Sequence, residues 1–145
     1  TGRPIELTCA ACPGFVEFVE RGELRSDQVH VLAERLLAPI RAAEVDTLLL
    51  GCTHYPFLAR TISDVVGRDV VLVSSADETA FEIRAILADT GQGRRAHKAG
   101  RHTWMSSGDV DAFRTLGLRL LGPEIDRVDR WEPDATPRRD SRSRT

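Results

Sequence analysis

The segment of the sequence with the most reactive side chains is GCTHYP, residues 51–56. The thiol of Cys52 can act as a proton carrier or a nucleophile. The imidazole of His54 can exchange protons near neutral pH or steady the charge of a neighbouring thiol. Thr53 adds a hydroxyl and a backbone N–H that a carboxylate or an amine could bind. Three adjacent residues therefore offer acid–base and anion-binding chemistry.

The residues around this segment predict where it lies. The apolar run Thr47–Leu50 has no helical period, which predicts a strand buried on both faces of a parallel sheet. Gly51 ends the run, and Pro56 suits the first turn of a following helix. Cys52 is thus expected on a strand-to-helix turn, where the helix N-terminus favours a carboxylate ligand and a thiolate. The same pattern also fits a buried, inert cysteine.

The other two cysteines form a C-x-x-C pair at Cys9 and Cys12. Such a pair can be a redox dithiol or half of a zinc site. No second C-x-x-C pair follows, so we expect no metal site and interpret both residues as packing cysteines at a strand end. Three cysteines, an odd number, do not form a disulfide framework and suit the reducing cytoplasm.

Composition narrows the class of protein. The chain has 145 residues, 41% of them hydrophobic and 29% charged, which is ordinary for one globular domain. A net charge of −2 argues against general nucleic-acid binding. No apolar run approaches the ~20 residues that cross a bilayer, and no secretory signal opens the sequence. We therefore expect neither nucleic acid nor a membrane as a partner.

The N-terminal part predicts one short strand and two helices. Ile5–Thr8 is a strand candidate, and a helix is expected from Pro13 to about residue 21. Gly22 should end that helix, and Ser26 should cap the next one. Pro39 should kink this second helix or begin a fresh turn.

Strands and helices alternate after the cysteine turn. A helix should stop near Gly67, and Asp69–Ser74 reads as another buried strand. Asp77 and Glu78 suit the first turn of the next helix. This order predicts an α/β fold with a parallel sheet. The expected core side of the last helix is Phe81, Ile83, Ile86 and Leu87.

The C-terminal part begins with the basic segment 91–102, which we interpret as a solvated loop rather than an anion site. A strand is expected over Thr103–Ser106 and a helix over Asp109–Leu121. From Pro133 onward, Pro, Ser, Asp and Arg dominate, so that tail is expected to be disordered. The inward side of the helix should hold Val110, Phe113, Leu116 and Leu120.

Four segments resemble motifs of the bacterial glutamate racemases, within the aspartate/glutamate racemase family. Their order and spacing agree with that family over about residues 5–131. The segments are GCTHYP at 51–56, ACPGFV at 11–16 with VERG at 19–22, SADETA at 75–80, and SGD at 107–109 through FR at 113–114 with LG at 121–122.

The resemblance implies a three-layer αβα lobe and a domain order. Residues 1–75 would be the C-terminal racemase lobe that carries the second catalytic cysteine. Residues 76–131 would return to an N-terminal lobe, with a short closing strand near Val128, and residues 132–145 would be a tail. Because the sequence begins at Thr1 rather than Met, we expect it to start part-way through a longer protein and to lack the first lobe.

The resemblance also implies an activity: racemisation of glutamate by two thiols, without a cofactor or a metal. Cys52 would be the base toward L-glutamate and the acid toward D-glutamate. His54 would assist that thiol and contact substrate, Thr53 would hold substrate, and Glu20 would be an acidic residue of the cleft. The product would supply peptidoglycan synthesis and hence cell shape. The implied partners are glutamate, the missing N-terminal half and, as an option, a second copy.

Some residues depart from the family, and alternatives stay open. Ser74 stands where the family usually has Asp or Asn, and neither Cys9 nor Cys12 matches the first catalytic cysteine. Aspartate racemases share the architecture. A cysteine hydrolase or transferase could use Cys52 as nucleophile and His54 as base. A non-catalytic, carboxylate-binding remnant is the third interpretation.

Overall fold

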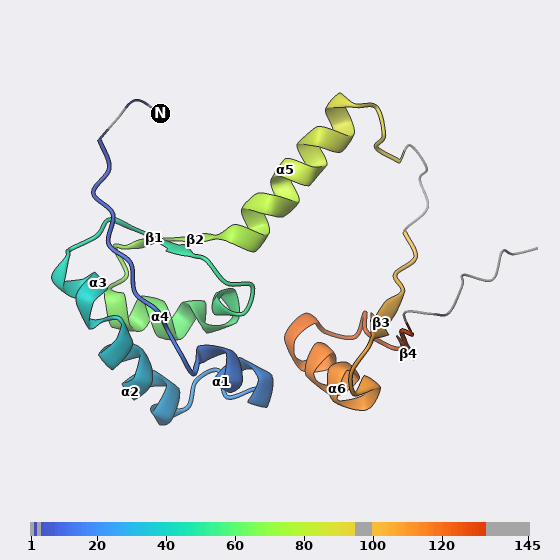
Figure 1. Cartoon of the computed structure of the whole chain (residues 1–145), viewed down its shortest axis with the longest axis horizontal. Helices are drawn as coiled ribbons and strands as arrows, with labels where there is room; N and C mark the ends of the chain where they lie inside the picture. Colours follow the sequence, from blue (N-terminus) through green and yellow to red (C-terminus); the bar gives the residue numbers. More distant parts are fainter. Residues whose placement is uncertain (1, 3, 95–99, 133–145) are drawn as a thin grey trace, which may run out of the picture. The chain divides into compact units, whose positions relative to one another are not determined.

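The computed structural model describes residues 2, 4–94 and 100–132. The chain divides into two compact units on either side of residue 97, and each is described by itself (Figure 1). Within the described residues, no helix is both long and apolar enough to cross a membrane.

The first unit holds six of the helical segments and two strands. In chain order they are α1 (Phe15–Arg21), α2 (Asp27–Leu36), α3 (Ala38–Ala42), β1 (Thr47–Leu50), the 3-10 turn η1 (Tyr55–Leu58), α4 (Ala59–Val66), β2 (Val71–Ser74) and α5 (Ser75–Asp89).

The ends of the early helices follow from single residues. Gly22 adopts a left-handed conformation with φ 73° and ends α1, as predicted. The side chain of Ser26 accepts a hydrogen bond from the N–H of Val29 at 3.3 Å and caps α2. Pro39 lies in the first turn of α3, so the predicted fresh start is also confirmed.

The core of the first unit lies among α1, α2, α4 and η1. Five side chains there are at most 1% exposed: Phe15 and Val19 of α1, Val29 of α2, Leu58 of η1 and Ile62 of α4. The packing of α2 against α4 brings these side chains together. Figure 1 shows α2, α3 and α4 on one side of the two strands.

Strands β1 and β2 pair in parallel, with Leu50 opposite Ser74. The predicted α/β class with parallel strands is therefore confirmed. The predicted burial of both faces is wrong for the described chain: Leu50 is 3% exposed, but Leu49 is 62% and Val71 60% exposed. Side chains alternate between the faces of a strand, so one face packs on the helices and the other is open.

Two further expectations of the first unit are wrong. No strand forms over Ile5–Thr8, and Ile5 is 76% exposed, because no described strand pairs with this segment. Helix α5 contains no buried residue, so its expected core side is exposed. Both segments carry apolar side chains that the described residues do not cover.

The second unit holds β3 (Trp104–Ser106), α6 (Val110–Leu121) and β4 (Val128–Arg130). Strands β3 and β4 pair in parallel, with Trp104 opposite Val128, so the short closing strand is confirmed. The side chain of Asp109 accepts a hydrogen bond from the N–H of Ala112 at 2.8 Å and caps α6.

Helix α6 packs through its smallest residue. Gly117 is buried, and a Cβ built there would lie 2.6 Å from Cδ1 of Ile125, which is fully buried. Phe113, expected to point inward, is 40% exposed. Gly117 follows Phe113 by four residues and lies on the same side of the helix, so Ile125 covers this side at Gly117, whereas the described residues leave it partly open at Phe113.

The described residues neither confirm nor contradict the predicted domain division, and parts of the basic loop and the tail lie outside them. The division into domains at residues 75 and 131 stays a prediction. Residues 95–99 of the basic loop and residues 133–145 of the tail lie outside the described residues.

Thr61 links α4 to the loop after α1, and this contact yields a stability prediction. Thr61 is 5% exposed, and its hydroxyl donates to the carbonyl of Leu24 at 2.9 Å. Replacing Thr61 by Val keeps the shape and leaves that carbonyl without its donor. We expect a loss of about 1–2 kcal/mol in the free energy of unfolding, measured by urea denaturation.

The matched control is Thr79→Val in α5, whose hydroxyl donates to the carbonyl of Ser75 on an exposed helix. Water can replace that donor, so a change below about 0.5 kcal/mol is expected. Equal losses for the two variants would refute the role given to Thr61.

Candidate active site

The cysteine turn lies between β1 and η1. The N–H of Tyr55 donates to the carbonyl of Cys52 at 3.1 Å and closes the turn. Pro56 follows in the first turn of η1, which leads directly into α4. The prediction that residues 52–54 lie on a strand-to-helix turn is confirmed, although the helical segment starts as a 3-10 turn.

The start of α5 is joined to the same edge of the sheet. The hydroxyl of Ser75 donates to the carbonyl of Leu50 at 2.9 Å, at the last residue of β1. The side chain of Ser74 accepts from the N–H of Asp77 at 3.2 Å and caps α5. Ser74, where the family usually has Asp or Asn, therefore serves as a helix cap here.

Three side chains approach one another across this edge. Sγ of Cys52 lies 3.9 Å from Nδ1 of His54. Nε2 of His54 lies 3.6 Å from Oε1 of Glu20, which comes from α1. The imidazole thus stands between a thiol and a carboxylate, and it pairs with the carboxylate when protonated.

These positions suit proton exchange with a bound molecule. Cys52 is half-buried, and the side chains of His54 and Glu20 are 34% and 59% exposed, so a substrate can reach all three. A protonated imidazole beside a thiol stabilises the thiolate, and a carboxylate on the far nitrogen orients the ring. Thr53 is exposed in the same turn.

Tyr55 holds the cysteine turn against α1, and the sequence did not predict this contact. Its hydroxyl donates to the carbonyl of Cys12 at 3.5 Å, and its ring meets Phe15 edge-on with centroids 5.5 Å apart. Phe15 and Glu20 share α1, so this contact helps to hold the carboxylate near His54. The two aromatic residues are far apart in the sequence, and no local pattern joins them.

The three cysteines have different surroundings, and none forms a disulfide. Cys12 is 7% exposed, and burial raises the pKa of its thiol. Cys9 is exposed, so the expectation of two packing cysteines is wrong for it. The described residues before Cys12 form no helix or strand, which leaves Cys9 without a core to join. Within the described part of the chain, no group of three His, Cys, Asp or Glu side chains is placed to hold a metal ion.

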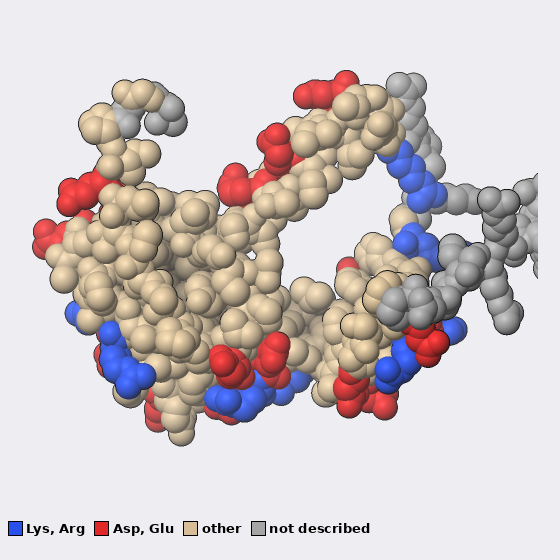
Figure 2. Space-filling model, viewed as in Figure 1, with Lys and Arg blue, Asp and Glu red and all other residues tan. Residues whose placement is uncertain are grey.

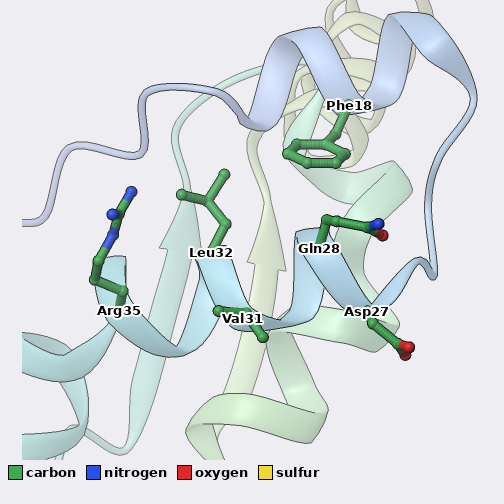
Figure 3. A pocket seen from close by; sticks show the side chains of 6 residues that line it. All are labelled: Phe18, Asp27, Gln28, Val31, Leu32 and Arg35. Atoms are coloured by element: carbon green, nitrogen blue, oxygen red, sulfur yellow. The ribbon is translucent and has the colours of Figure 1, made fainter.

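A separate groove of about 480 Å³ lies between α1 and α2. Phe18 reaches from α1 toward Gln28 and Leu32 of α2 (Figure 3). Asp27 and Arg35 supply its charged groups. None of its lining residues belongs to the cysteine turn, and we attribute no part of the chemistry to it.

The environment of Tyr55 predicts a shifted titration. Burial, followed by the negative charge of Cys12 and Cys52 when ionised, raises the pKa of the Tyr55 hydroxyl. The neutral form therefore favours the fold. The contribution of Tyr55 to the stability of the fold is complete below about 10, the pKa of tyrosine in an unfolded chain. It is lost as pH rises through the higher pKa of Tyr55 in the folded chain.

The measurement is direct because Tyr55 is the one tyrosine of the sequence. The tyrosinate absorbance of the native chain should titrate at higher pH than that of the chain in urea. Tyr55→Phe should lose the signal, together with its part of the alkaline fall in stability. Equal midpoints in the two solvents would contradict the structure.

Cysteine accessibility gives a second prediction. Because the thiolate is the reactive form, iodoacetamide should modify exposed Cys9 at least about tenfold faster than buried Cys12. Mass spectrometry of the modified peptides measures both rates. The difference should vanish in denaturant, and equal rates in the native chain would show that Cys12 is not packed as described.

Comparison with known proteins links this geometry to one group of enzymes. No family model matches the chain. It is 51% identical over 125 residues to the glutamate racemase of Acidothermus cellulolyticus, covering 86% of this chain and 48% of that relative. It is 46% identical over 133 residues to the glutamate racemase of Mycobacterium tuberculosis, covering 90% and 49%.

Solved structures agree. The glutamate racemase isoform RacE1 of Bacillus anthracis matches with a TM-score of 0.79 at 35% identity, over 86% of this chain and 46% of that one. The Thermus thermophilus glutamate racemase, solved with beta-chloro-D-alanine, matches with a TM-score of 0.76 at 35% identity, over 86% and 47%. The chain is therefore similar in sequence and in fold to glutamate racemases, and it spans about half the length of those it matches.

Proposed function

We propose that this chain is the C-terminal portion of a glutamate racemase and supplies one wall of its active site. The observation that carries the proposal is the Cys52 thiol beside His54, with Glu20 behind the imidazole, at the carboxyl ends of two parallel strands. The identity of 46–51% to relatives named glutamate racemase supports the same reaction.

In the proposed reaction, Cys52 is present as the thiolate and takes the α-proton of L-glutamate. The Cα–H bond breaks, the proton moves to Sγ, and the electron pair stays on the α-carbon. A second thiol on the opposite wall then donates its proton to the other face, which gives D-glutamate. The reverse reaction uses the same groups in opposite roles. His54 stabilises the thiolate of Cys52, and Glu20 orients the imidazole. Thr53 and His54 hold the substrate.

The second thiol is proposed to lie in the missing N-terminal half. Cys12 is buried and Cys9 lies in an unpaired segment, so neither forms an opposing wall. Alone, this chain should be inactive or nearly so. Joined to that half it would need no cofactor and no metal, and a homodimer is a further option for the complete enzyme.

The biological role follows from the product. D-glutamate is a building block of peptidoglycan, so the enzyme would serve cell-wall biogenesis and cell shape. Glutamate rather than aspartate is proposed because the relatives above are named for it. The three free cysteines favour a reducing cytoplasm as the compartment.

A cysteine hydrolase or transferase is the second candidate. The Glu20 carboxylate near His54 supplies the third orienting group that such a site needs. An acyl group trapped on Cys52 without exchange of the α-proton would favour it. Tight binding of a carboxylate without either reaction would favour a non-catalytic remnant.

The central prediction concerns Cys52 in the complete enzyme. Cys52→Ala should abolish racemisation in both directions, measured by circular dichroism of the glutamate enantiomers, because one of the two proton carriers is gone. Cys9→Ala is the control and should leave the rate unchanged, since Cys9 is exposed and outside the turn. More than a trace of turnover in Cys52→Ala would refute the two-thiol role.

A further inference from the structure

Helix α5 (Ser75–Asp89) is the largest element without a buried side chain in the described part of the chain. Its large apolar residues are exposed to an unusual degree for a helix of an α/β protein. They are Phe81 at 55%, Ile83 at 53%, Ile86 at 50% and Leu87 at 39%.

The apolar residues of α5 occupy more than one side of the helix. Ala76, Ala80, Ile83 and Leu87 follow one another at intervals of three and four and form one stripe. Phe81 lies on the opposite side, two residues before Ile83 in a helix of 3.6 residues per turn. A helix that is apolar on several sides is normally buried within a larger protein.

Three of the five charged residues of this helix lie along one edge, and the other two, Asp77 and Arg84, lie outside it. Glu78, Glu82 and Asp89 are spaced four and seven residues apart, so their carboxylates line one side. Figure 2 shows acidic side chains gathered along an edge of α5. This edge is the side suited to face water when the others are covered.

The strands next to the start of α5, β1 and β2, also have an open face. Leu49 and Val71 are 62% and 60% exposed there. Helix α5 starts directly after β2, and Ser75 is hydrogen-bonded to the end of β1. Parallel sheets are normally covered on both faces, so an uncovered one lacks a layer.

We infer that α5 and the open face of β1–β2 form one docking surface for the half of the racemase that this chain does not contain. This inference rests on the proposed function. The relatives are about twice as long as the matched region, since the chain covers 48% of the Acidothermus enzyme and 46% of the Bacillus structure. The unmatched part is large enough to cover two sides of a helix and a sheet face.

The test compares the same substitutions in two proteins. One is the 145-residue chain. The other is a chimaera in which this chain replaces its matched region in the Acidothermus cellulolyticus enzyme. Ile83→Glu should leave the Tm of the chain unchanged, because Ile83 is already exposed. It should lower the Tm of the chimaera by about 5 °C or more, because the new carboxylate is then buried.

Two further variants sharpen the comparison. Phe81→Glu, on the other side of α5, should behave like Ile83→Glu. Glu82→Gln, on the acidic edge, should be neutral in both proteins. Hydrogen exchange gives an independent measure: the α5 amides should exchange more slowly in the chimaera than in the chain.

Results that contradict the docking surface differ from the result that contradicts the proposed function. Neutral Ile83→Glu and Phe81→Glu in a folded chimaera, or a chimaera that does not fold, would overturn the inference. A dimer of the chain that Ile83→Glu dissociates, seen by sedimentation equilibrium, would assign the surface to a second copy instead. None of these readouts uses turnover. A stable chimaera with the expected shifts but no racemisation would refute the proposed function alone.

Discussion

The parallel pairing of β1 with β2 is the constraint on which the site depends. The register sets Leu50 opposite Ser74, so both strands end at one edge of the sheet. The residues that follow each strand, the cysteine turn and the start of α5, therefore meet there, joined by the hydrogen bond from Ser75 to Leu50. Ligands of α/β proteins bind at this edge because the chain turns there and frees backbone donors.

The second requirement is that α1 lies against the cysteine turn. The contacts of Tyr55 with Phe15 and with the carbonyl of Cys12 span the two segments. They bring Glu20 within 3.6 Å of His54 without burying either side chain. The side chains of Cys52, His54 and Glu20 therefore reach solvent, and the sheet and helix beside them have uncovered apolar faces. This arrangement is expected if a separate lobe forms the other side of a cleft.

Local features could be predicted from the sequence, whereas burial could not. The stop at Gly22, the cap at Ser26 and the turn at Cys52 follow from backbone chemistry within a few residues, and the structure confirms them. Leu49 and Ile83 lie in apolar patterns typical of buried segments, but both are exposed. Such a pattern indicates that a side chain is suited to packing, and it does not indicate which segment covers it. The resemblance implied that Glu20 is an acidic residue of the cleft, but its approach to His54 was not predicted, since it depends on the packing of α1.

The most direct test of the account isolates Cys52 as the single proton carrier. In the chimaera with the Acidothermus cellulolyticus enzyme, the catalytic cysteine expected in the other lobe is replaced by alanine. The protein is then incubated with L-glutamate or D-glutamate in heavy water, and NMR follows the loss of the α-proton. Exchange is expected from L-glutamate and not from D-glutamate. Exchange from D-glutamate, or from neither, would contradict the role of Cys52.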